Sequence, residues 1–182
     1  MTKAHIHITG ASGCGVTTLG GALAAELGIT QLDTDDYYWM PPVSEYNEKR
    51  PIPGRLQLLE QEFASLDGWV LSGALESWGD PIAHYFDVVI FLQVPTETRL
   101  KRLRQREAER YGAENIALGG RHHEETEAFI EWASLYDAGT HKSRTLKRHE
   151  DWLATMTCPV LCLDGELPTE DLVEAVMSVL RS

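Results

Sequence analysis

The stretch HIHITGASGCGVTT, residues 5–18, decides the fold of this chain. A β-rich segment, residues 4–9, leads directly into a glycine-rich run that nearly matches the phosphate-binding pattern G-x-x-x-x-G-K-[ST]. Gly10, Gly15 and Thr17 fit the pattern, but Val16 stands where the pattern has a lysine. Three interpretations follow: an enzyme whose cation has moved elsewhere, a nucleotide binder without chemistry, or a chance match.

Strand and helix patterns alternate along the rest of the chain. The expected strands are 4–9, 29–32, 69–72, 87–94 and 159–163, and the expected helices are 17–27, 52–66, 96–111, 123–137, 143–154 and 169–180. Thr96 is the expected N-cap of its helix, and residues 35–51 are expected to form a loop. This alternation predicts an α/β fold with a parallel sheet and helices on both faces. Ligands in such folds bind at the carboxyl ends of the strands.

Length and composition favour one globular domain spanning residues 1–182. Apolar residues make up 43% of the chain and charged residues 24%, and the net charge is −12. This acidic balance argues against nucleic-acid binding and against a polybasic membrane contact. The three cysteines lack metal-ligand spacing, and we find no apolar leader or membrane span. We therefore expect a cytoplasmic protein, either a monomer or a homodimer.

The glycine-rich run is the first candidate site. Its glycines permit positive φ angles, and its backbone N–H groups, at a helix N-terminus, suit phosphate oxygens. The Thr17 hydroxyl is a candidate ligand of Mg²⁺. The alternative is a plain tight turn between a strand and a helix. The residues expected to bind the nucleotide are Gly10, Ser12, Gly13, Cys14, Gly15, Val16, Thr17 and Thr18.

Three aspartates follow the second expected strand, in the sequence Asp33-Thr34-Asp35-Asp36. Their position places them at the same edge of the sheet as the glycine-rich run. We predict that Asp33 supports Mg²⁺ and that Asp35 accepts a proton from an acceptor substrate. Asp36 is read as a cap. The alternative is an Asp-rich turn that caps its own backbone.

An arginine-rich segment, residues 99–110, stands out in this acidic chain. Arg99, Arg102, Arg106 and Arg110 share one helical stripe, and arginine suits bidentate contact with phosphate. We predict that this stripe, Arg102 and Arg106 above all, replaces the missing lysine. The alternative is a solvated helix face.

Weaker signals complete the candidate site. Arg50 and Arg55 lie near the aromatic residues Tyr37, Tyr38, Trp39 and Tyr46, and either enclose an acceptor or belong to the surface. Gly73, after the third expected strand, permits close approach of a substrate. Gly119 and Gly120 suggest a hinge, and the basic group Lys142, Arg144 and Arg148 has no assigned role.

The loop, the aspartates and the arginine helix together resemble the P-loop small-molecule kinases, of the adenylate kinase and shikimate kinase kind. The resemblance covers essentially the whole chain. It implies a sheet of order 2-3-1-4-5, an acceptor-binding segment near residues 34–66 and a helical lid near 106–142. It also implies ATP and Mg²⁺, with Mg²⁺ support from Asp33, acceptor contact from Asp35 and phosphate contact from Arg102 and Arg106.

The narrower resemblance is to a bacterial adenylate-kinase-like group whose loop lacks the lysine. The quoted motifs are D-T-D-D-Y-Y-W and L-S-G-x-L-x-x-W-G-D. The chain departs from nucleoside monophosphate kinases because no D-G-[FY]-P-R follows its third strand. The function expected is transfer of the γ-phosphoryl of ATP to a nucleotide, nucleoside or hydroxyl compound. The alternatives are a nucleotide-binding switch with little or no transfer activity, and a slow NTPase.

Overall fold

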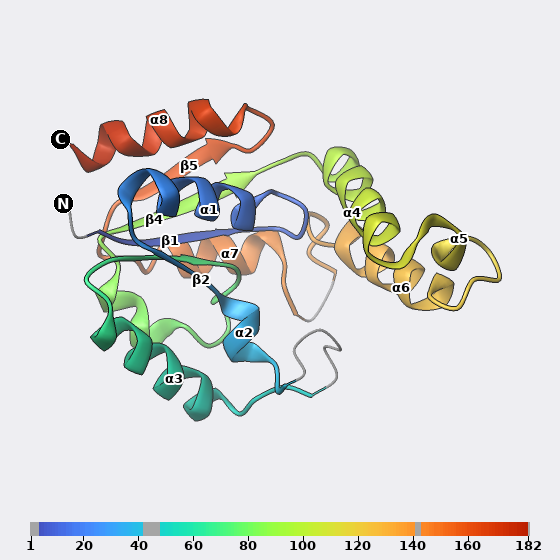
Figure 1. The fold of residues 1–182 in the computed structure, drawn as a ribbon, viewed down its shortest axis with the longest axis horizontal. Coiled ribbons are helices and arrows are strands. Elements are labelled where there is room, and N and C mark those ends of the chain that lie inside the picture. The colour runs from blue at the N-terminus through green and yellow to red at the C-terminus, as the bar shows by residue number, and fades with distance from the viewer. Residues whose placement is uncertain (1–3, 42–47, 141–142, 182) are drawn as a thin grey trace.

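The computed structural model describes residues 4–41, 48–140 and 143–181. These residues form a five-stranded parallel sheet in the order β2-β3-β1-β4-β5 (Figure 1). The strands are β1 (His5–Gly10), β2 (Thr30–Asp33), β3 (Trp69–Ser72), β4 (Val88–Gln93) and β5 (Val160–Asp164). The predicted fold class and strand order are therefore confirmed.

Helices cover both faces of the sheet because the strands alternate their side chains between two apolar clusters. On one face, Ile6 and Ile8 of β1 pack with α1 (Val16–Leu27) and α8 (Thr169–Leu180). The other face packs against α3 (Ile52–Ser65), the 3₁₀ helix η2 (Asp80–Tyr85) and α7 (Leu146–Leu153). Both layers are visible in Figure 1.

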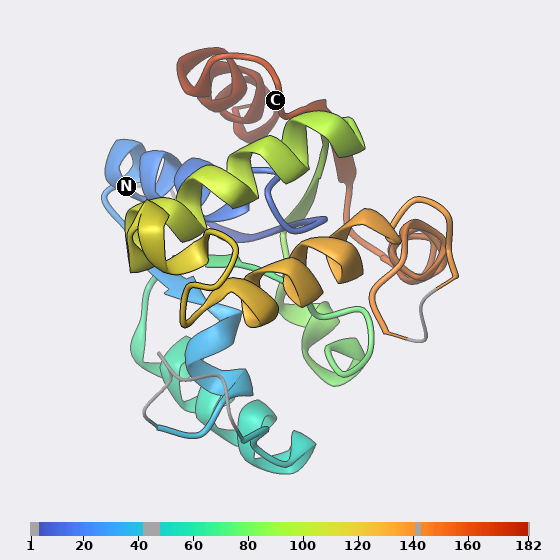
Figure 2. The ribbon, with the colours of Figure 1, turned by 90° about the vertical axis from the view of Figure 1, so that its right-hand side faces the viewer.

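A helical arm extends beyond the carboxyl ends of the strands. It consists of α4 (Thr96–Tyr111), α5 (Ala113–Ile116) and α6 (His123–Ser134). Figure 2 shows α4 and α6 crossing in front of the sheet when the carboxyl ends face the viewer. The arm has an apolar cluster of its own, with Leu103, Ile130 and Ala133 at its centre. It occupies the place where the resemblance implies a lid.

Several local predictions were wrong. A short helix, α2 (Thr34–Tyr38), occupies part of the expected loop, and Asp33 rather than Asp36 caps it. The N-cap of α4 is Pro95, not Thr96, because Pro95 has an extended backbone (ψ 144°) and Thr96 is already the first helical residue; the Thr96 hydroxyl donates to the Asp137 carboxylate. Helix α7 is shorter than expected. Within the described residues, no helix has the length and apolar character needed to cross a membrane.

Candidate active site

A cavity of about 480 Å³ lies at the carboxyl ends of the strands. It brings together most of the predicted site: the glycine-rich loop, both predicted aspartates, Gly73 and two arginines of the arm. It does not include Arg50 or Arg55. The lining residues are Gly10, Ala11, Ser12, Gly13, Gly15, Val16, Thr17, Thr18, Asp33, Thr34, Asp35, Gly73, Ala74, Arg102, Leu103, Arg106 and Arg144.

The loop between β1 and α1 depends on the backbone freedom of glycine. Gly13 and Gly15 adopt φ angles of 87° and 93°, a region that L side chains rarely enter. A Cβ on Gly13 would also lie 2.8 Å from the Arg99 carbonyl oxygen, so α4 packs directly onto the loop. The Cys14 side chain is buried in the core, where burial raises the pKa of its thiol, and the Cys14 N–H donates to the Ala11 carbonyl oxygen at 3.1 Å. Cys14 does not line the cavity, so its predicted contact with the nucleotide has no support in the structure.

Val16 has a structural role at the position of the absent lysine. It is the first residue of α1, it lines the cavity, and its side chain packs against the apolar cluster beneath α1 and α8. The valine therefore extends the core up to the floor of the cavity. Any cation that serves bound phosphates must come from another element.

The side-chain oxygens of Asp33 and Thr17 lie close together at the carboxyl end of β2. The Thr17 hydroxyl donates to Asp33 Oδ2 at 3.3 Å, and Asp33 Oδ1 accepts the Asp35 backbone N–H at 3.0 Å. Desolvation raises the pKa of Asp33, and the neighbouring charge of Asp35 adds to this effect. Carboxylate and hydroxyl oxygens are ligands that suit Mg²⁺, so this pair fits the predicted metal support.

Asp35 faces two arginines across the cavity. Desolvation by the cavity walls raises the pKa of Asp35, and the charges of Arg144 and then Arg106 oppose that shift. A carboxylate with a raised pKa is a better proton acceptor. The geometry is compatible with the predicted contact between Asp35 and an acceptor hydroxyl.

The arginine stripe divides into structural and cavity-lining residues. Arg99 is buried, 1% exposed, and donates to the Val94 carbonyl oxygen at 3.1 Å and to Asp137 Oδ2 at 2.8 Å. It joins the base of α4 to the end of α6, so its predicted place among the phosphate contacts is wrong. Arg102 and Arg106 line the cavity, whereas Arg110 does not.

Arg50 and Arg55 stabilise the segment that follows α2. Arg50 donates to the carbonyl oxygens of Tyr37 and Trp39, at 2.9 and 3.2 Å. Arg55 is buried, 6% exposed, with its guanidinium 3.8 Å from the centre of the Tyr38 ring. The structure thus favours the packing role over direct acceptor contact. The predicted residues Tyr46 and Lys142 lie outside the described residues.

Arg144 is a cavity residue that the sequence placed only in a basic group without a role. Its Nη1 lies 3.4 Å from Ser12 Oγ of the loop, and its Nε lies 3.4 Å from Glu76 Oε1. Glu76 in turn lies beside the buried His149. No spacing rule connects residues 12, 76, 144 and 149, so only the fold reveals this group.

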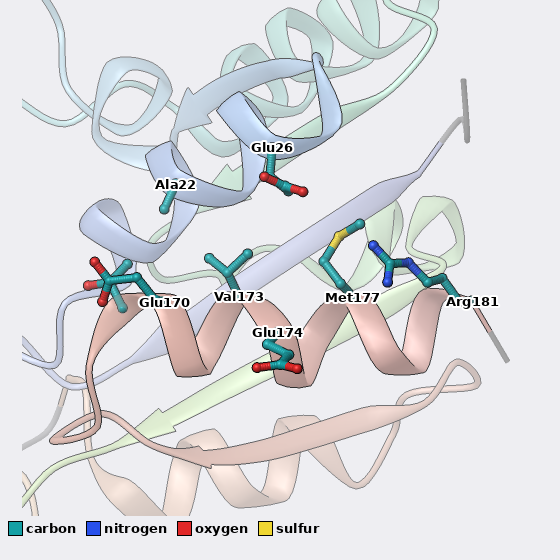
Figure 3. Close-up of a pocket in the computed structure, with 8 residues that line it drawn as sticks. Ala22, Glu26, Glu170, Val173, Glu174, Met177 and Arg181 are labelled. Carbon is teal, nitrogen blue, oxygen red and sulfur yellow. The ribbon is translucent and has the colours of Figure 1, made fainter.

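A second hollow, of about 440 Å³, lies between α1 and α8. Figure 3 shows Val173 and Met177 of α8 pointing toward α1, which carries Ala22 and Glu26. The carboxylates Glu26, Glu170 and Glu174 and one cation, Arg181, also line it. This acidic lining disfavours phosphate groups, so the cavity at the strand ends is the better candidate for nucleotide binding.

Comparison with known proteins agrees with this architecture. A family model described as AAA domain matches residues 6–129. A shikimate kinase from Bacteroides thetaiotaomicron aligns with a TM-score of 0.56 at 21% identity, covering 98% of this chain and 99% of that one. A deoxyadenosine kinase from M. mycoides aligns with a TM-score of 0.55 at 19% identity, covering 97% and 98%. At these identities the likeness shows a shared fold, the P-loop kinase fold.

A sequence relative extends the comparison over the full chain. The Bacillus subtilis protein YqaC, described as uncharacterized, is 46% identical over 180 residues, which is 99% of each chain. The chain belongs to the P-loop small-molecule kinase family.

Proposed function

We propose that this protein transfers the γ-phosphoryl group of ATP to a small acceptor that carries a hydroxyl or phosphate group. The observation that carries the proposal is the composition of the cavity at the strand ends. One cavity holds a phosphate-type loop, a carboxylate at the expected acceptor position and three arginines. Phosphoryl transfer requires mainly positioning and stabilisation of charge, and these are the groups that supply both.

In the proposed reaction, the loop N–H groups hold the phosphates of ATP. Asp35 orients the acceptor and takes its hydroxyl proton, or orients an acceptor phosphate through bridging water. The acceptor oxygen then bonds to the γ-phosphorus as the bond to the β–γ bridging oxygen breaks, and ADP leaves. Arg102 and Arg106, on the arm, lie where they can stabilise charge that develops on the transferred group.

Thr17 and Asp33 would hold Mg²⁺. When bound there, the ion neutralises charge on the phosphates. The 3.3 Å approach of their oxygens supports this assignment. Desolvation raises the pKa of Asp33, and a bound cation would oppose that shift because it favours the ionised carboxylate.

The test is a coupled assay of ADP release from Mg·ATP with the full-length protein. The acceptor panel contains nucleoside monophosphates, nucleosides and sugar acids. We expect one class to stimulate ADP release, and Asp35→Asn to reduce that stimulation by roughly 10²–10⁴-fold, as for loss of a general base. Asp36→Asn is the matched control, because Asp36 is a neighbouring exposed carboxylate that does not line the cavity.

One observation favours a second candidate function. Val16 removes the usual contact to the β- and γ-phosphates, which suits a protein that binds nucleotide and changes the position of its arm without transfer. Such a switch would bind ATP and ADP with different affinities but release no acceptor-dependent ADP. The same assay therefore distinguishes the two functions.

A further inference from the structure

Three arginines line the cavity, and two of them contact residues outside the loop. Arg102 donates from Nη1 to the Gly165 carbonyl oxygen at 3.1 Å, in the turn after β5. Arg106 is 56% exposed and pairs with Glu107 at 3.1 Å on its own helix. Arg144, by contrast, contacts a side chain of the phosphate loop itself, the Ser12 hydroxyl.

Arg144 is held in place by a carboxylate on its opposite side. Glu76, in the segment after β3, is 6% exposed and directs Oε1 toward Arg144 Nε. A guanidinium fixed by a buried partner loses little freedom when it meets an anion, so it can act as a preorganised donor. On the other side of the guanidinium, Nη1 of Arg144 lies 3.4 Å from Ser12 Oγ of the loop.

Glu76 is itself anchored by a buried polar network. Its Oε2 lies 3.3 Å from Nε2 of His149, a residue with no exposed surface. His149 Nε2 also lies 3.1 Å from the Thr9 hydroxyl, and its Nδ1 lies 2.7 Å from the Tyr136 hydroxyl. His149 therefore lies between Glu76 and the hydroxyls of Thr9 and Tyr136, and its two ring nitrogens connect all three.

The charge on Glu76 is consistent with this anchoring role. Burial alone raises its pKa, but the hydrogen bond from His149 and the charge of Arg144 outweigh burial and lower the pKa of Glu76 to about 2. Glu76 is therefore ionised at neutral pH and forms a charged pair with Arg144. Thr9 immediately precedes Gly10, so the network connects the base of the loop with the arginine above it.

We infer that Arg144 supplies the positive charge that Val16 removes from the phosphate loop, and that Glu76, supported by His149, is the positioning residue that holds it there. The inference rests on the proposed nucleotide site. Arg144 would contact the β- and γ-phosphates of the nucleotide, which are the groups that a loop lysine reaches. Glu76 and His149 would act through Arg144 and need not touch the nucleotide.

The experiment measures the affinities of the full-length protein for AMP and for ATP by calorimetry. We expect Arg144→Ala to weaken ATP binding about 10–100-fold, the effect of one lost hydrogen bond to a charged group, and AMP binding less than about threefold. Glu76→Gln should weaken ATP binding by about 3–10-fold in the same selective way. A purely structural role for Glu76 would leave the ratio of the two affinities unchanged, and that result overturns the inference.

Two further variants complete the test. Arg104→Ala is the matched control, because it also removes one arginine, from a surface pair with Glu127, and should leave both affinities unchanged. The double variant that carries Val16→Lys and Arg144→Ala should bind ATP at least about tenfold more tightly than Arg144→Ala alone if the two cations serve the same phosphates. Failure of the natural chain to bind ATP refutes the proposed function. Equal binding of ATP by the natural chain and Arg144→Ala refutes only the present inference.

Discussion

The ion pair between Arg99 and Asp137 should be a main determinant of stability at the base of the arm. Arg99 is 1% exposed, and its guanidinium pairs with the Asp137 carboxylate at 2.8 Å. Asp137→Asn keeps the size of the side chain and its ability to accept a hydrogen bond, but it removes the negative charge. The change leaves a buried guanidinium without a counter-charge, which is the costly way to break such a pair.

The magnitude follows from the burial of Arg99 and from its other contacts. Removal of one partner from a buried pair costs about 3–5 kcal/mol. The carbonyl oxygens of Val94 and Ala133 also accept from Arg99, at 3.1 and 3.4 Å, and Asp137 is 46% exposed, so some solvation remains. We therefore expect the lower end, about 3 kcal/mol of unfolding free energy, or about 6–12 °C in Tm for a chain of this size.

Urea unfolding followed by circular dichroism gives the free energy of unfolding directly. The matched control is Glu127→Gln, the same chemical change in the surface pair of Glu127 with Arg104, which is 51% exposed. That change should cost about 0.2–1 kcal/mol. If the two substitutions cost the same, the assignment of Arg99 as a buried structural residue is wrong.

Three further predictions concern the sheet and the site. Burial lowers the pKa of His7 from 6.5 to about 3. The free energy of unfolding should therefore be unaffected by His7 above pH 6.5 and should decrease as the pH falls from 6.5 toward 3, because the unfolded state takes up the proton first. An NMR titration midpoint of His7 above about 5.5 in the folded protein would contradict this. Gly20→Ala should lower the free energy of unfolding, measured in urea, by about 1–3 kcal/mol, because the new Cβ would overlap the Ser72 hydroxyl. Gly21→Ala should cost less, because its Cβ would meet only the flexible end of the Gln31 side chain. Asp33→Asn should reduce the gain in ATP affinity that Mg²⁺ provides, and it should leave the affinity for ATP without Mg²⁺ within about threefold of that of the natural chain. If calorimetry shows the same Mg²⁺ effect in both proteins, Asp33 does not support the metal.

The fold was largely predictable because its determinants are local in sequence. The apolar run of β4 and the strand–loop–helix order around Gly10 each follow from short-range patterns. The strand order came from the family resemblance, since alternation alone does not specify which strands are neighbours. Helix α2 was missed because it is five residues long and depends on one cap, the Asp33 carboxylate.

The site was predictable only where its residues follow strand ends. Asp33, Asp35 and Gly73 were found for that reason, and the cavity includes all three. The arginine stripe was only partly correct, because periodicity groups residues on a helix face but does not say which turn of that face is buried. Arg99 lies in the turn covered by α6.

The contact between Arg144 and Ser12 joins residues that are 132 positions apart. No periodic or motif signal in a single sequence reports such a separation. Its partner Glu76 had no distinguishing feature in the sequence, and the burial that makes it informative is a property of the folded chain. Side chains that cooperate through tertiary contacts were therefore the part of the site that the sequence did not reveal.

The measurement that tests the central claim most directly is a calorimetric titration of the full-length protein with Mg·ATP. If the loop cradles phosphates without a lysine, the titration should show saturable binding of one ATP per chain, and Thr17→Ala should weaken it by about tenfold, the effect of losing one Mg²⁺-linked hydroxyl. A folded protein that shows no saturable binding of ATP, with or without Mg²⁺, would contradict the assignment of the cavity as a nucleotide site.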